Sequence, residues 1–291
     1  MSFSGEIKQE LCRSENLQHC CLKAQTAGIL MFAKSFSAQK ILFSCEHRAS
    51  IELAAGRLAE LFGVITEITV PLSARGKTLY TLTVPDSNDR LKLSNYYRDY
   101  EKLLKKSCCT SAFIGGVFLA CGTAADPAKK SYRLEFNVGA EKKALMMKKM
   151  LSRLEISCSV SERSGVYVVY LNEREPIIDL LGYIGAVSSY WKLFNTAVER
   201  DYRNRATRIT NCDNANINRT ADAAAVQLVA IKKLAASGIL DTLSEQLRQV
   251  AALRTDNPEA SLRELCELTD NTVTRSSMNR RLAKLVELAE E

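Results

Sequence analysis

Cysteine and histidine are the side chains of this 291-residue chain best suited to hold a transition metal, and it has ten cysteines but two histidines. No CxxC pair occurs, and thiols such as Cys121 and Cys158 lie in apolar stretches, where a reduced cysteine acts as a small hydrophobe. The strongest ligand cluster is His19-Cys20-Cys21. Adjacent ligands are poorly spaced for tetrahedral zinc, and no second ligand pair follows at a usable distance. The sequence therefore predicts no metal, no cofactor and no redox site.

Basic and amide side chains near the C-terminus suggest a second chemistry, contact with a polyanion. Apolar residues recur at i, i+4, i+7 and i+11 from Met278 to Ala289, which predicts a helix with one buried stripe. Its other face is basic, and no acid occurs between Asp270 and Glu287. Such a face suits the major groove of DNA, where Arg binds phosphates and Arg or Asn reads base edges. The candidate DNA-binding residues are Ser261, Thr274, Arg275, Ser276, Ser277, Asn279, Arg280, Arg281 and Lys284.

A helix-turn-helix is expected to position this face. Ser261 with Glu264 three residues later forms a capping box, which predicts a short helix to about residue 268. A turn over residues 269–272 follows, longer than in compact repressors and without a glycine, and the last helix starts near Thr274. An alternative is a small helical cap or dimerisation bundle with a basic exterior. Two further helices are expected before the motif, over residues 221–236 and 243–253.

The segment from Arg200 to Thr220 is rich in arginine and asparagine. Asparagine favours turns, so the segment is interpreted as a structured loop between domains. Its side chains could bind DNA, or could hydrogen-bond their own backbone in a hinge. The residues expected to make these secondary DNA or hinge contacts are Arg203, Arg205, Arg208, Asn211, Asn214, Asn216 and Arg219.

An internal repeat precedes this segment. AQTAGILMF from Ala24 matches AFIGGVFLA from Ala112, which aligns Gly28 with Gly116, and a Cys-Cys pair precedes each at the same offset of 88 residues. Small residues let two helices approach closely, so we expect these helices to form a seam between two halves. The order in each half is α-β-β-α-β-β-α, which favours a duplication over two unrelated helices. Beyond the seam, helices are expected over residues 50–62, 141–154 and 175–183, and strands over 40–44, 64–70, 78–84, 132–138, 157–161 and 166–171.

With these motifs together, the chain resembles the LAGLIDADG homing endonucleases and, more closely, the WhiA family of sporulation and cell-division regulators. The resemblance rests on SFSGEIKQEL (2–11), AFIGGVFLACGTAADP (112–127), NRATRITNCDNANINRT (204–220) and NPEASLRELCELTDNTVTRSSMNRRLAKL (257–285). It implies an α+β fold in which a duplicated LAGLIDADG-like domain is followed by an all-α helix-turn-helix domain. The expected boundaries are 1–205 for the first domain, with repeats of about 1–105 and 106–205, then an Asn/Arg-rich linker over 206–220 and the last domain over 221–291.

In the nucleases of that fold, an acid near the end of each seam helix holds a divalent metal at the scissile phosphates. Carrying the nine-residue motif across gives four acid positions, which here are Met31, Ala33, Leu119 and Cys121. A hard cation such as Mg²⁺ needs oxygen ligands, and none of these side chains has one. We therefore expect no catalytic residue and no nuclease activity.

The sheets of such a domain are a second surface that could bind DNA. The candidate bases there are Arg75, Lys77, Arg133 and Arg163, each of which could equally be ordinary solvated charge. The formal net charge of +7 mildly favours a polyanionic partner.

No signal peptide is evident, and the uncharged run 110–125 is too short for a bilayer and is broken by three glycines. A soluble, cytoplasmic and nucleoid-associated protein with no membrane partner is expected. The resemblance implies a non-enzymatic regulator of transcription that binds double-stranded DNA and acts in cell division, chromosome segregation or sporulation. The alternatives are an adaptor whose N-terminal domain binds another transcription regulator, or a metal-dependent endonuclease with ligands recruited from elsewhere.

Overall fold

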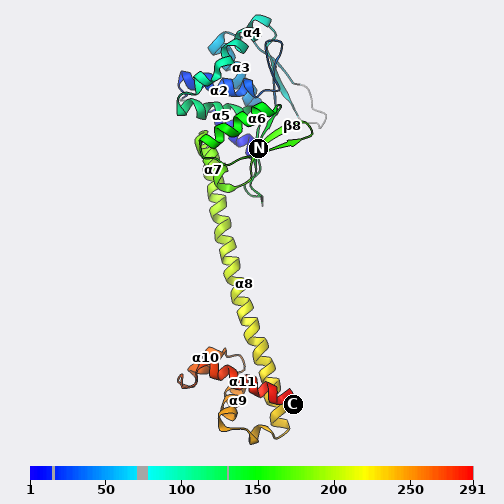
Figure 1. Ribbon diagram of the computed structural model, residues 1–291, viewed down its shortest axis with the longest axis vertical. Coiled ribbons are helices and arrows are strands. Elements are labelled where there is room, and N and C mark those ends of the chain that lie inside the picture. Colours follow the sequence, from blue (N-terminus) through cyan, green and yellow to red (C-terminus); the bar gives the residue numbers. More distant parts are fainter. Residues whose placement is uncertain (15–16, 71–77, 130, 291) are drawn as a thin grey trace. The chain divides into compact units, whose positions relative to one another are not determined.

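The two sequence repeats fold into the same order of elements in the computed structural model, which describes residues 1–14, 17–70, 78–129 and 131–290 (Figure 1). The first repeat comprises α2 (His19–Met31), β1 (Ser35–Phe36), β2 (Ile41–Cys45), α3 (Arg48–Phe62), β3 (Glu67–Thr69), β4 (Tyr80–Thr83) and α4 (Ser87–Tyr96). The second comprises α5 (Ser107–Cys121), β5 (Gly122–Ala124), β6 (Leu134–Val138), α6 (Glu141–Arg153), β7 (Ser159–Arg163), β8 (Val166–Leu171) and α7 (Arg174–Tyr183). The predicted duplicated α+β fold is confirmed. α1 (Phe3–Cys12) and a 3₁₀ segment, η1 (Tyr97–Leu104), complete this part.

Each repeat contributes one antiparallel four-stranded sheet. The strand orders are β1-β2-β4-β3 and β5-β6-β8-β7, so the two sheets have equivalent topology. Phe43 pairs with Leu82 in the first sheet and Phe136 with Val169 in the second, and all four side chains are buried. β1 and β5 were not predicted, because strands of two and three residues leave almost no alternation to detect.

The seam between the repeats is the pair of helices α2 and α5, which lie side by side (Figure 1). A Cβ atom added to Gly28 would lie 2.1 Å from the carbonyl oxygen of Phe113, so that the two backbones are in direct contact. Both helices are buried on most sides, which explains why their sequences are so apolar. Within the described part of the chain, no helix is both long and apolar enough to cross a bilayer.

α8 (Val187–Ala236) begins against α1. The Glu10 carboxylate of α1 accepts hydrogen bonds from the backbone N–H groups of Ser188 and Ser189 at 2.6 and 3.1 Å, and so caps the first turn of α8. Farther along, the guanidinium of Arg200 donates to the carbonyl oxygens of Pro127 and Lys129, both at 2.7 Å. These contacts join residues 187–200 to the first of two compact units, Met1–Arg200 and Asp201–Glu291.

The second unit is helical throughout. It contains the remainder of α8, the short η2 (Leu240–Thr242), α9 (Glu245–Asp256), α10 (Leu262–Glu267) and α11 (Arg275–Glu290). Its own core includes Ile231 and Leu234 of α8, Val250 of α9 and Leu265 of α10, together with the buried stripe of α11. The prediction of a structured loop over 200–220 is wrong, because every residue of that segment is helical.

Candidate nucleic-acid interface

The turn between α10 and α11 sets the direction of the candidate recognition helix. Asp270 and Asn271 adopt φ values of +49° and +58°, in the left-handed region that Asp and Asn tolerate better than other non-glycine residues. The N–H of Asn271 donates to the carbonyl of Cys266 at 3.0 Å, and the hydroxyl of Thr272 donates to the carbonyl of Thr269 at 2.7 Å. The turn therefore closes without a glycine.

The start of α10 is held by the predicted capping box. The backbone N–H of Ser261 donates to the Glu264 carboxylate at 2.7 Å, and Ser261 Oγ accepts from the N–H of Glu264 at 3.3 Å. Hydrogen bonding of the Glu264 carboxylate to the backbone N–H and to the side chain of Ser261 lowers the pKa of this carboxyl below its ordinary range. In this structure the hydroxyl of Ser261 caps a helix, a role that differs from its predicted contact with DNA.

α11 has the two faces that its sequence predicts. Met278, Leu282 and Leu285 are fully buried, and Ala289 is nearly so. The opposite face exposes a compact group of polar and basic side chains, hereafter the α11 polar face: Arg275, Ser276, Asn279 and Arg280. A helix with one face fixed in a core and the other presenting guanidinium and amide groups is suited to contact DNA phosphates and base edges.

The other predicted residues on α11 have partners within the protein. Thr274 Oγ1 accepts from the N–H of Ser277 at 3.3 Å, which caps the helix start. Arg281 donates to Gln246 of α9 at 3.1 Å, and Lys284 pairs with Glu287 at 2.9 Å. Arg281 therefore helps to fix α11 against α9, while the Lys284 pair partly neutralises the end of the basic face.

Sequence reasoning missed a buried arginine that supports the same motif. Arg254 of α9 is 2% exposed, and its guanidinium donates to the carbonyl oxygens of Asn257 and Ala260 at 3.3 and 2.6 Å. Burial lowers the pKa of this guanidinium. It ties the loop before α10 to the end of α9. Its place in the apolar stripe of α9, seven residues after Leu247, is the signal that could have found it.

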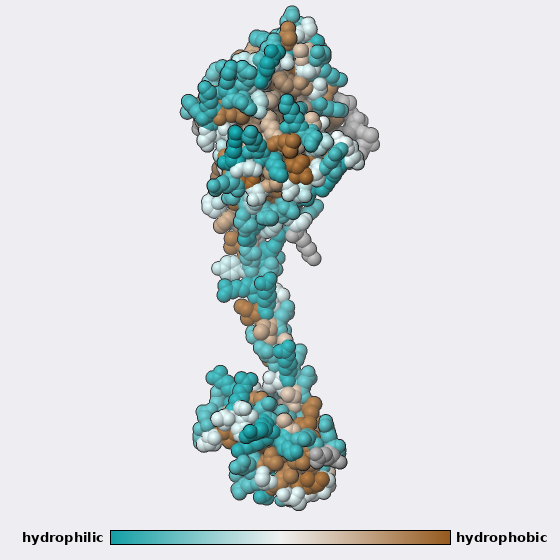
Figure 2. Space-filling model, viewed as in Figure 1, coloured by the Kyte–Doolittle hydropathy of each residue, from teal (hydrophilic) through white to brown (hydrophobic). Residues whose placement is uncertain are grey.

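The Asn/Arg-rich segment lies on an exposed stretch of α8. All residues of 201–219 are exposed, and Figure 2 shows that the surface of this stretch is mostly hydrophilic. Because each residue turns a helix by about 100°, the seven predicted residues divide between two faces. Arg205, Arg208, Asn216 and Arg219 share one face, and Arg203, Asn211 and Asn214 occupy the other.

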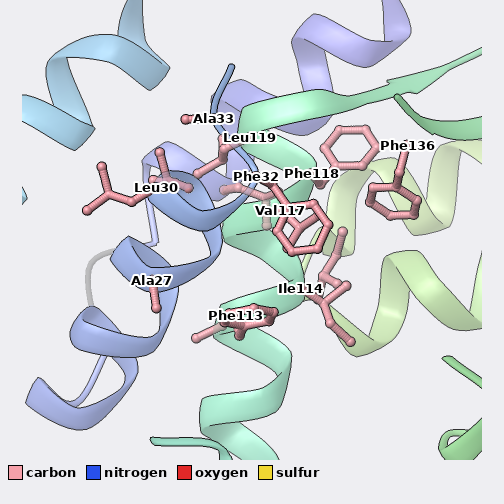
Figure 3. Close-up of a cluster of buried hydrophobic side chains, with 14 of the residues drawn as sticks. Ala27, Leu30, Phe32, Ala33, Phe113, Ile114, Val117, Phe118, Leu119 and Phe136 are labelled. Carbon is pink, nitrogen blue, oxygen red and sulfur yellow. The ribbon is translucent and has the colours of Figure 1, made fainter. Parts of the chain in front are cut away.

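The four positions at which nucleases of this fold carry acids are distributed differently in space. Leu119 is fully buried and Met31 packs against the core, whereas Ala33 and Cys121 line a cleft of about 870 Å³ at the ends of α2 and α5. Figure 3 shows Leu119 among the core side chains and Ala33 at the end of its helix. Of these four positions, only 33 and 121 have side chains that could face a ligand in this cleft.

Two lysines line the cleft at the place where the nucleases of this fold concentrate acids. Lys8 and Lys143 lie close enough to Cys121 for their charges to act on it, and His47 and Glu46 also line the cleft. Burial raises the pKa of the Cys121 thiol to about 12, although the charges of Lys8 and Lys143 oppose that rise. Burial, together with the charge of Lys8, lowers the pKa of His47. Fixed positive charge and thiol ligands are both unfavourable for Mg²⁺.

The structure describes two of the four basic residues predicted on the sheets. Arg75 and Lys77 lie outside the described residues. Arg133 donates to Glu135 at 2.6 Å and stacks over the ring of Tyr170 at 4.1 Å, and Arg163 lies 3.6 Å from the same carboxylate. Since Arg133 and Arg163 share one acid, they are poorer candidates for DNA contact than the α11 polar face.

The two Cys-Cys pairs meet at the beginning of the seam. The four sulfur atoms of Cys20, Cys21, Cys108 and Cys109 all lie within 4.8 Å of one another. The expected absence of a second ligand pair at a usable distance is therefore wrong. The second pair comes from the other repeat.

Two family models match consecutive parts of the chain. The WhiA LAGLIDADG-like domain matches residues 110–203, and the WhiA C-terminal HTH domain matches residues 206–289. In solved structures, full-length WhiA from Thermotoga maritima is similar with a TM-score of 0.63 and 24% identity, covering 100% of this chain and 98% of that one. The N-terminal LAGLIDADG domain of WhiA is similar with a TM-score of 0.52 and 21% identity, covering 63% of this chain and 90% of that one. These likenesses show the fold.

Curated relatives match over the full length. "Probable cell division protein WhiA" of Ruminiclostridium cellulolyticum is 33% identical over 306 residues, covering 100% of this chain and 97% of that protein. The protein of the same name from Desulfitobacterium hafniense is 34% identical over 310 residues, covering 100% and 96%. With both repeats, the seam and the helix-turn-helix in place, this chain belongs to the WhiA family, with a LAGLIDADG-like domain and a C-terminal helix-turn-helix domain.

Proposed function

We propose that this chain binds double-stranded DNA through the α11 polar face and regulates transcription linked to cell division. The observation that carries the proposal is the arrangement of Arg275, Ser276, Asn279 and Arg280, which are exposed on a helix whose other face is fixed in a core. The family supports it, since its C-terminal domain is a helix-turn-helix and its members are named as cell-division proteins. Roles in sporulation or chromosome segregation and association with the nucleoid extend the same proposal.

The expected contacts follow from the chemistry of this face. Arg275 at the start of α11 and Arg280 one and a half turns later can each bind phosphate and release counterions. Asn279 can form two hydrogen bonds to adenine in the major groove, and Arg280 can do the same with guanine. Phosphate contacts would set the position of the helix, and the contacts to bases would give the sequence preference.

The test compares two variants of the full-length chain that lose the same charge. Arg280→Ala should reduce affinity by about 1–3 kcal/mol for sites located by genome-wide mapping of bound DNA. The control is Arg248→Ala, an exposed arginine on α9. Residue 248 lies about 200° around α9 from Gln246, which contacts α11. The control substitution should therefore leave the affinity for DNA almost unchanged. Equal decreases in affinity for the two variants would contradict the proposed interface.

The regulatory part of the proposal needs a separate readout. Transcripts adjoining the bound sites should change in a strain carrying Arg280→Ala, with protein abundance matched to the wild type. The adaptor alternative, in which the N-terminal domain recruits another regulator, predicts that this strain keeps normal expression and division. Plasmid cleavage with Mg²⁺ or Mn²⁺ tests the endonuclease alternative, and we expect none because residues 33 and 121 carry no carboxylate.

A further inference from the structure

The four cysteines at the start of the seam, hereafter the seam cysteines, occupy equivalent places in the two repeats. Cys20 and Cys21 are the second and third residues of α2, and Cys108 and Cys109 are the second and third of α5. The four thiols approach one another across the seam, with all sulfur atoms within 4.8 Å. Each repeat therefore supplies one vicinal pair to a single cluster.

The seam explains why pairs 88 residues apart meet. Gly28 and Gly116 have the same offset as the cysteine pairs, so each pair has the same helical phase relative to its glycine. The close approach at these glycines holds the helices together about two turns farther along. With backbones this close, side chains near both helix starts are brought into a small volume.

We propose that the seam cysteines bind one zinc ion in a tetrahedral structural site: Cys20, Cys21, Cys108 and Cys109. Zinc binds thiolate sulfur at about 2.3 Å, which places tetrahedral sulfur atoms about 3.8 Å apart. The four sulfur atoms already lie within 4.8 Å of one another, so small side-chain adjustments complete the site. An iron–sulfur cluster requires its ligands to surround several iron atoms, for which this cluster is too contracted.

Two helix starts and one lysine lie at the cluster. All four cysteines lie in the first turns of α2 and α5, and a helix N-terminus stabilises negative charge. Zinc with four thiolates carries a net charge of −2. Lys106 immediately precedes α5 and lies close enough to Cys20 for its charge to favour the thiolate. Lys106 is therefore placed to offset part of the remaining charge.

Burial indicates a structural role for the metal. Cys21 and Cys109 are buried, Cys20 is partly buried and Cys108 is exposed, so an ion can enter from the side of Cys108. Four protein ligands leave no open position for a substrate. Bound zinc would join the starts of α2 and α5 and hold the two repeats together beside the glycine contact.

Elemental analysis of the reduced full-length chain, purified with zinc present, is the first test. We expect about one zinc per chain and, after replacement by Co²⁺, the thiolate charge-transfer and intense visible bands of a tetrahedral sulfur site. The variant Cys20→Ser with Cys108→Ser, which changes the two more exposed ligands, should lose the metal and melt at a lower temperature. The matched control is Cys158→Ser with Cys212→Ser, whose thiols are likewise partly buried and exposed and should leave the metal in place.

Three results would overturn the proposal. The first is wild-type protein that binds less than about a tenth of an equivalent of zinc under these conditions. The second is stoichiometric zinc in the Cys20/Cys108 variant. The third is mass spectrometry of the unreduced protein from cells showing disulfides between the pairs, which would make the cluster a covalent link in place of a metal site. The measurement on wild-type protein decides the matter even where a variant fails to fold.

Discussion

Gly28 of α2 and Gly116 of α5 make reciprocal contacts across the seam. A Cβ atom on Gly28 would lie 2.1 Å from the carbonyl oxygen of Phe113, and one on Gly116 would lie 2.1 Å from that of Gln25. Both neighbours are backbone atoms, so no side-chain rotation can relieve such an overlap. The approach of the two repeats therefore depends on the absence of a side chain at both positions.

Gly28→Ala or Gly116→Ala should destabilise the N-terminal unit strongly. Overpacking costs typically about 1–3 kcal/mol and occasionally more, and backbone overlap belongs at the upper end. Gly56→Ala is the matched control, because Gly56 lies within α3 with nothing within 4 Å of its Cβ position. It should stabilise the chain by about 0.5–1 kcal/mol. Urea unfolding measures all three, and a seam variant as stable as the wild type would contradict the backbone contact.

The seam was also the part of the fold most open to prediction from sequence. The aligned glycines, the apolar helices and the repeated order of elements all recur in one chain, and burial on both sides keeps those patterns strong. α8 was not predicted as continuous, because local preference assigns asparagines to turns. Residues 187–200 are already fixed as helix by Glu10 and Arg200, and propagation costs less than nucleation. The cysteine cluster was missed because metal ligands were sought only at short spacing along the chain, although the common offset of 88 residues and the expected seam bring the two Cys-Cys pairs together.

The capping box predicts a dependence of the C-terminal unit on pH. Because the pKa of Glu264 is lowered in the folded protein, its carboxylate stabilises the fold at neutral pH. That contribution is present above the ordinary glutamate pKa and is lost as the pH falls through the lower folded value. Hydrogen exchange of residues 262–267, corrected for intrinsic rates, should show less protection in acid, and Glu264→Gln should remove this dependence.

Replacing the serine of the box should act at neutral pH. Ser261→Ala should cost about 1 kcal/mol and lower the protection of α10 about fivefold. Ser244→Ala is the matched control, because Ser244 precedes α9 without a side-chain hydrogen bond to its first turn. Equal loss of protection at α9 and α10 would show that the hydrogen bonds of the box contribute nothing measurable.

We expect arginines on the two faces of the exposed stretch of α8 to contribute differently to DNA binding. If DNA contacts this stretch, it can touch one side of the helix at a time, and Arg205 and Arg208 share the face with the larger number of arginines. Arg205→Ala with Arg208→Ala should weaken DNA binding and lower the salt slope by about 0.9 for each phosphate that is no longer neutralised. Arg203→Ala, on the other face, should change the slope little. If the decrease in DNA affinity for each arginine removed is the same on both faces, the substitutions act only through net charge.

The cleft at the ends of the seam helices predicts that restoring acids alone will not restore a metal site. Ala33→Asp with Cys121→Asp returns carboxylates to the two positions that face the cleft, but Lys8 and Lys143 line the same cleft, close enough to influence residue 121. The new carboxylates should pair with these ammonium groups and bind Mn²⁺ weakly. Adding Lys8→Met and Lys143→Met should strengthen Mn²⁺ binding at least tenfold, which corresponds to about 1.4 kcal/mol. Calorimetric titration of folded variants measures both affinities, and equal affinity in the two would show that the lysines do not oppose metal binding in this cleft.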